Sequence, residues 1–192
     1  MKKFILTPVM VILAMMQLYS QEPGLDPELQ WPSYRGYHAR GVLDNTGLPD
    51  SWNVKTGENI LWKYRIPGLG LSSPVIWGDM LFLTTAVSKE DNEGFKTGFY
   101  GSIGSVEDES EHEWKIICLD KNSGELVWEK TACQGVPRQK RHPKSSHANS
   151  TMATDGNYLL AFFGSEGLYC YDMNGELQWK KDFGLLRSVF FA

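Results

Sequence analysis

A short pattern ending in tryptophan occurs twice in this chain, and a weaker form of it occurs once. Residues 119–128 have the sequence LDKNSGELVW, and residues 171–179 have YDMNGELQW, with one residue fewer in the turn. The weaker copy, at 56–62, has TGENILW. In the two full copies, two potential strands flank a turn whose Asn and Gly residues tolerate the positive φ that a hairpin requires. The pattern therefore predicts repeated hairpins that each present a tryptophan at the same place.

A second pattern precedes each full copy. Residues 73–84 (SPVIWGDMLFLT) and 150–163 (STMATDGNYLLAFF) each contain two apolar runs separated by Gly-Asp or Asp-Gly. Each unit then has four strands, A to D, with tight A–B and C–D turns. No helical periodicity of useful length follows residue 20. We expect an all-β fold of two four-stranded antiparallel sheets, with strands near 73–77, 80–86, 114–119, 126–130, 151–154, 158–163, 167–171 and 176–180.

The repeat resembles that of the pyrroloquinoline-quinone-like (PQQ-like) β-propellers. These include quinoprotein dehydrogenases and the propeller lipoprotein of the outer-membrane β-barrel assembly machinery. The resemblance covers about residues 31–184. It implies four-stranded antiparallel blades with tryptophan-docking repeats, in which each Trp docks between neighbouring blades against the Gly of the adjacent repeat. The structural docking residues it indicates are Trp62, Trp128, Trp179, Asp120, Gly124, Asp172 and Gly175.

The number of repeats predicts an incomplete propeller. Rings of this family have about seven or eight blades. This chain supplies about two, at 71–130 and 150–181, within a propeller region of 57–192 that follows an N-terminal segment at 21–56. Two blades alone leave open sheet edges and faces. We therefore expect a fragment of a larger propeller; the alternative is a two-blade protein that oligomerises into a ring.

The first twenty residues have the character of a secretory signal peptide. Lys2 and Lys3 precede an apolar run at 4–18, and Ser20 is a small residue suited to cleavage. The alternative is an uncleaved membrane anchor, although the run is short for a span and contains Pro8. We expect a periplasmic or secreted protein with no membrane span after signal cleavage.

Two long connections are expected at one end of the sheets, because alternate connections of an antiparallel meander share an end. The B–C connection of the first unit, 87–113, is acidic (Glu107, Asp108, Glu109, Glu111 and Glu113), and the 131–149 connection between the units is basic. They are either solvated loops that pair loosely or a charged rim for a protein or polymer ligand. The possible rim-binding residues are Arg138, Arg141, Lys144 and His147; the alternative for His147 is a hydrogen-bonded structural role.

Signals for catalysis and for metal binding are missing from the sequence. Cys118 and Cys170 occupy one repeat position and suit small buried thiols, and with Cys133 they form no CxxC or His/Cys metal spacing. In PQQ dehydrogenases the cofactor is held by vicinal cysteines beside a calcium ion, and neither adjacent cysteines nor a matching acidic cluster occurs here. We predict no catalytic, cofactor-binding or metal-binding residue.

The function expected from these features is that of a non-catalytic exported propeller, acting as a scaffold or binding module. The main alternative is the N-terminal fragment of a PQQ-dependent quinoprotein oxidoreductase, with PQQ and calcium as cofactors; a third is a sugar- or polymer-associated secreted module. A nucleic-acid partner is not expected, since the formal net charge is −4.

Overall fold

The fold consists of two four-stranded antiparallel sheets. The computed structural model describes residues 25–44, 46–90, 105–106 and 109–186, so the expected signal peptide lies outside them. The described residues contain no α-helix, only the short 3-10 turns η1 (Pro27–Leu29), η2 (Tyr37–Ala39) and η3 (Gly164–Glu166). The first sheet has the order β1 (Val75–Trp77), β2 (Met80–Ser88), β3 (His112–Asp120) and β4 (Leu126–Gly135). The second has the order β5 (Ala153–Thr154), β6 (Tyr158–Phe162), β7 (Leu168–Asp172) and β8 (Leu177–Lys181).

The all-β prediction and the two antiparallel sheets are confirmed, with each strand close to its expected place. The expected ends of the long connections were wrong. His112 pairs with Gly135 and with Ser88, so β2, β3 and β4 all extend into segments assigned to the 87–113 and 131–149 loops. A ladder of backbone hydrogen bonds continues through polar residues as readily as through apolar ones, whereas the sequence pattern marks a strand only while its side chains stay apolar.

The two sheets have the same register at their centres. In the first, Phe82 pairs with Cys118, which pairs with Trp128. In the second, the corresponding row is Leu160, Cys170 and Trp179. Both ladders shift register immediately after the cysteine. The sequence repeat is therefore a structural repeat, residue for residue, across three strands.

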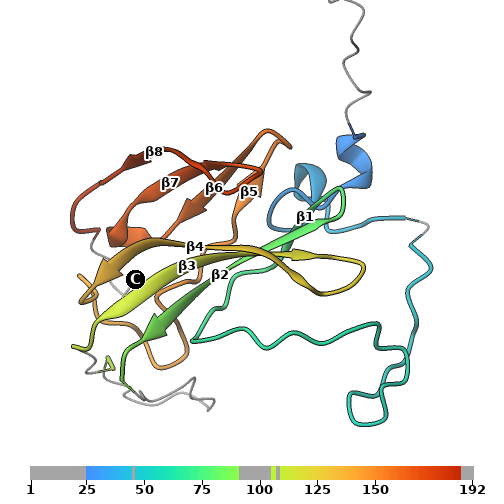
Figure 1. The fold of residues 1–192 in the computed structure, drawn as a ribbon, viewed down its shortest axis with the longest axis horizontal. Helices are drawn as coiled ribbons and strands as arrows, with labels where there is room; N and C mark the ends of the chain where they lie inside the picture. The colour runs from blue at the N-terminus through green and yellow to red at the C-terminus, as the bar shows by residue number, and fades with distance from the viewer. Residues whose placement is uncertain (1–24, 45, 91–104, 107–108, 187–192) are drawn as a thin grey trace, which may run out of the picture.

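A shared core lies between the sheets, which Figure 1 shows stacked face to face. Val75, Phe82 and Cys118 contribute from the first sheet and are fully buried. Leu159 contributes from the second, together with Met152 just before β5. Burial of each large apolar side chain stabilises the fold by about 1.5–3 kcal/mol, so this layer holds the units together.

The N-terminal segment joins the two sheets along their first strands. Trp31 forms an antiparallel bridge with Ile76 of β1, and the Thr154 N–H of β5 donates to the Pro32 carbonyl at 2.9 Å. The weak repeat copy at 56–62 does not form a hairpin ladder; only one bridge, between Asn53 and Glu58, is present there. Asn53 takes the place of Asp in this turn and accepts from the N–H groups of Lys55 and Thr56.

Substitution of Gly156 can test the close contact between the second unit and Trp77 of the first. The φ of Gly156 is +88°, and an added Cβ would lie 2.3 Å from the Trp77 indole. We expect Gly156→Ala to lower the free energy of unfolding by about 1–2 kcal/mol through the backbone and by about 1–3 kcal/mol more through overpacking. Gly57→Ala is the matched control, because Gly57 has φ +83° and open space around it. If chemical denaturation shows that both variants lose the same free energy of unfolding, the contact with Trp77 has no energetic consequence.

Candidate functional site

Trp128 of β4 docks onto the turn between β7 and β8. Its Nε1–H donates to the Met173 carbonyl at 3.2 Å, and a Cβ on Gly175 would lie 3.0 Å from the indole. The Asp172 carboxylate shapes this turn by accepting from the backbone N–H groups of Asn174 and Glu176. Glycine at 175 thus lets the ring approach the backbone, while the aspartate fixes the carbonyl that receives the indole.

Trp62 repeats this arrangement on the first sheet. Its Nε1–H donates to the Lys121 carbonyl at 2.8 Å, and a Cβ on Gly124 would lie 2.4 Å from the ring. Asp120 accepts from the N–H groups of Asn122 and Ser123, and these backbone hydrogen bonds lower the pKa of its carboxyl. The tryptophan, glycine and aspartate positions taken from the sequence therefore come together in the same geometry on both sheets.

Trp179 occupies the third equivalent position but has no turn beneath it. Its side chain is 47% exposed, and its indole nitrogen makes no hydrogen bond to any described residue. With Tyr158, Leu160 and Cys170 it lines a hollow of about 400 Å³ on the outer face of the second sheet. On the first sheet the equivalent face is covered by the second sheet. On the second sheet this face is open.

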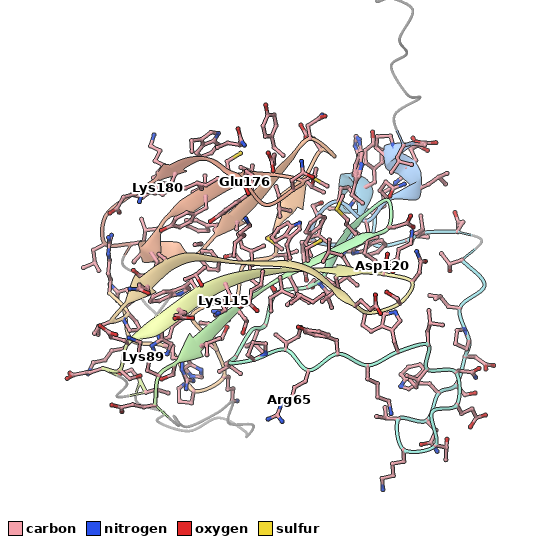
Figure 2. All side chains as sticks on the ribbon, viewed as in Figure 1. Arg65, Lys89, Lys115, Asp120, Glu176 and Lys180 are labelled. Carbon is pink, nitrogen blue, oxygen red and sulfur yellow. The ribbon has the colours of Figure 1, made fainter. Side chains whose placement is uncertain are left out.

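The two long connections meet at one end of the sheets, here called the long-loop end. The Val106 N–H donates to the Arg141 carbonyl at 2.9 Å, which joins the β2–β3 connection to the β4–β5 connection. Figure 2 shows Lys89 near the long-loop end and Asp120 at the opposite end of the first sheet. The common end expected from the antiparallel order is confirmed, whereas Glu107 and Asp108 lie outside the described residues.

Arg138 ties the β4–β5 connection to the second sheet. Its guanidinium forms two hydrogen bonds with the Asp182 carboxylate, at 2.8 and 2.9 Å, and donates to the Ser165 carbonyl. Its backbone N–H donates to Oε1 of Glu166 at 2.8 Å. The hydrogen bond from Arg138 lowers the pKa of Asp182 to about 2, while burial raises the pKa of Glu166.

The other rim candidates have different surroundings. Arg141 is only 3% exposed, and its guanidinium donates to the Ser145 carbonyl at 3.2 Å. It therefore holds the connection from within rather than presenting a charge at the surface. Lys144 is half-buried, and its backbone N–H donates to Nδ1 of His142.

His147 belongs to a cluster of aromatic rings. Its carbonyl accepts from the Trp114 indole N–H at 3.0 Å, and its ring stands edge-on to that of His112, with 5.0 Å between the centroids. His112 is 4% exposed, and its Nδ1 lies 3.0 Å from the Ser110 carbonyl. The cluster packs the first sheet against the connection.

A cavity of about 260 Å³ opens at the long-loop end beside this cluster. Its walls come from β3, from the β4–β5 connection and from the turn between β6 and β7. The lining residues are Trp114, Gln139, Ser146, His147, Asn149, Ser150, Phe162, Phe163, Gly164, Ser165, Glu166 and Leu186. Sequence reasoning found only His147 among them; the short β6–β7 turn shares this end by the same antiparallel rule but carries no charge pattern that draws attention to it.

The three cysteines are free thiols. Burial raises the pKa of Cys118 to about 12, and burial also raises those of Cys133 and Cys170. Thiols held protonated in this way are poor nucleophiles and poor metal ligands. Within the part of the chain that the structure describes, no three His, Cys, Asp or Glu residues are grouped to hold a metal ion.

Comparison with known proteins adds no assignment: neither a family model nor a curated protein matches this chain. Across the described ranges, the structure has no helix of the length and hydropathy needed to cross a membrane. The site is therefore interpreted from its own geometry.

The ion pair between Arg138 and Asp182 has a measurable titration. Asp182 has a folded-state pKa of about 2, against about 3.9 for an unfolded chain. The pair thus stabilises the fold fully above the unfolded value, and its contribution is lost as the pH falls toward 2. We expect the Asp182 pKa to return toward 3.9 in Arg138→Gln, as followed by carboxyl-carbon NMR. Asp155, which is held by backbone N–H groups instead, is the internal control and should keep its lowered pKa.

Proposed function

We propose that this chain forms part of an exported, non-catalytic β-propeller of PQQ-like repeats that acts as a scaffold or binding module. The recurring docking contact carries the proposal. Trp62 and Trp128 each donate an indole N–H to the carbonyl of a glycine-containing turn one unit further along the chain. Contacts that repeat from one unit to the next are the basis of propeller and repeat architectures.

The open face around Trp179 supports the same interpretation. Monomeric proteins seldom leave a large contiguous apolar face uncovered. Here Tyr158 and Leu160 lie exposed beside Trp179, whereas Phe82, the counterpart of Leu160 on the first sheet, is fully buried. A further four-stranded unit with an Asp-x-x-x-Gly or Asp-x-x-Gly turn fits this face, because it supplies both a carbonyl acceptor and the space above a glycine.

The long-loop end is the proposed binding side. Its connections are braced by Arg138 and Arg141, so that exposed groups there are held by a rigid scaffold. We place the ligand, a protein or a polymer, on this end; the sequence at 1–20, which resembles a signal peptide, supports a periplasmic or secreted location.

A chain with one more repeat tests the scaffold directly. We expect a variant in which 131–181 is duplicated after Lys181 to bury Trp179, since Met173 and Gly175 of the added copy provide its acceptor and its space. The free energy of unfolding should rise by a few kcal/mol, as added interfaces do in repeat proteins. Trp179→Ala in the duplicated chain should remove most of that gain, by about 3–5 kcal/mol, but should change the original chain little.

Two measurements decide the outcome. The difference in acrylamide quenching between the duplicated chain and its Trp179→Ala variant reports whether Trp179 is protected, because the tryptophan of the added copy is common to both; denaturation reports the stability. A readily quenched contribution from Trp179 in the duplicated chain would refute the docking face. Separately, tight binding of PQQ with Ca²⁺ by the full-length protein, seen as a shift in quinone absorbance, would contradict a non-catalytic role and favour the oxidoreductase alternative.

A further inference from the structure

The cavity at the long-loop end has walls that are fixed before any ligand arrives. The Trp114 indole donates to the His147 carbonyl, and the Asn149 side chain accepts from the N–H and hydroxyl of Ser146 at 2.9 and 3.0 Å. On the opposite wall, the Ser165 hydroxyl accepts from the Leu186 N–H at 3.0 Å. A preorganised cavity loses little conformational entropy on binding.

Two side chains in the lining have hydrogen-bonding capacity to spare. Among the described residues, neither the Gln139 amide nor the Ser150 hydroxyl makes a hydrogen bond, and both side chains are half-buried at the cavity wall. An amide offers two donors and an acceptor, and a hydroxyl offers one donor and two acceptors. Gly164 adds space, because a Cβ there would meet no atom within 4 Å.

The lining is mainly apolar, and its one carboxylate is already compensated. Glu166 accepts from the Arg138 N–H through Oε1, and its Oε2 lies 3.5 Å from the guanidinium Nε. An anion would meet this carboxylate, and a cation would have to compete with Arg138 for it. The apolar side chains of the lining include those of Phe162 and Leu186, whereas Trp114 and Phe163 are only 1% and 5% exposed.

From these features we propose that the cavity binds a neutral, polyhydroxylated small molecule of about one sugar ring. Hydroxyl groups both donate and accept, as do Gln139 and Ser150, and the C–H face of a sugar packs on an aromatic ring, here that of Phe162. The volume of about 260 Å³ lies just below the range of about 300–1,000 Å³ typical of small-molecule sites. This inference rests on the proposed function and gives its binding end a ligand class.

Binding of matched sugars to the full chain tests the assignment. The probes are D-glucose, D-galactose and N-acetyl-D-glucosamine, with D-glucuronate and D-glucosamine as charged counterparts, followed by saturation-transfer NMR. We expect the neutral sugars to bind at millimolar concentration, and Gln139→Leu and Ser150→Ala each to weaken binding about threefold to tenfold. Neither substitution removes a hydrogen bond within the described chain, so both variants should melt as the parent does.

Gln134→Leu is the matched control, because Gln134 is exposed on β4 and does not line the cavity. It should leave sugar binding unchanged. The assignment is overturned if no neutral sugar binds, if a charged counterpart binds more tightly, or if Gln134→Leu weakens binding as much as Gln139→Leu. The duplicated-repeat experiment does not involve sugar. If sugar binding fails, the scaffold proposal is therefore still tested by the protection of Trp179 in the duplicated chain.

Discussion

The indole of Trp128 on the glycine turn of the second sheet is the contact on which the arrangement of the sheets depends. Stacked sheets are held mainly by non-directional apolar packing, which sets their spacing but permits sliding. The N–H bond from Trp128 to Met173 is directional and fixes one turn of the second sheet against one strand of the first. Gly175 makes the approach possible, because any Cβ there would touch the ring.

A second fixed point lies at the other end of the same interface. Arg138 extends from the β4–β5 connection and binds Asp182 just after β8, so the second sheet is tied to the first at both of its ends. The cavity lies between the Arg138 contacts and the Trp114–His147 hydrogen bond. Its shape therefore depends on the same docking that holds the units together, and both the repeated strands and the long connection contribute residues to its wall.

The parts of this fold that could be predicted from sequence are those with local causes. Asp172 and Gly175 form a turn through their own backbone and side-chain chemistry, and their repetition at Asp120 and Gly124 made the units visible. The burial of Arg141 and the cavity beside Gln139 arise from contacts between distant segments, and no pattern of neighbouring residues encodes them. The contact between Trp77 and Gly156 was missed for the same reason, although both belong to repeated turns.

Trp128 and Trp179 differ in whether a neighbouring sheet covers them. Both occupy the same register beside a buried cysteine, but the first is covered by a neighbouring sheet and the second is 47% exposed. The two docking contacts each use a backbone carbonyl and a glycine, which every full copy of the turn provides, and the proposed extension at Trp179 rests on this. The long-loop end is the opposite case, since its Arg138 contacts and its cavity are formed by segments that differ between the units. The face around Trp179 and the cavity at the long-loop end are thus separate surfaces, whereas Arg138 of the β4–β5 connection both borders the cavity end and holds the second sheet in place.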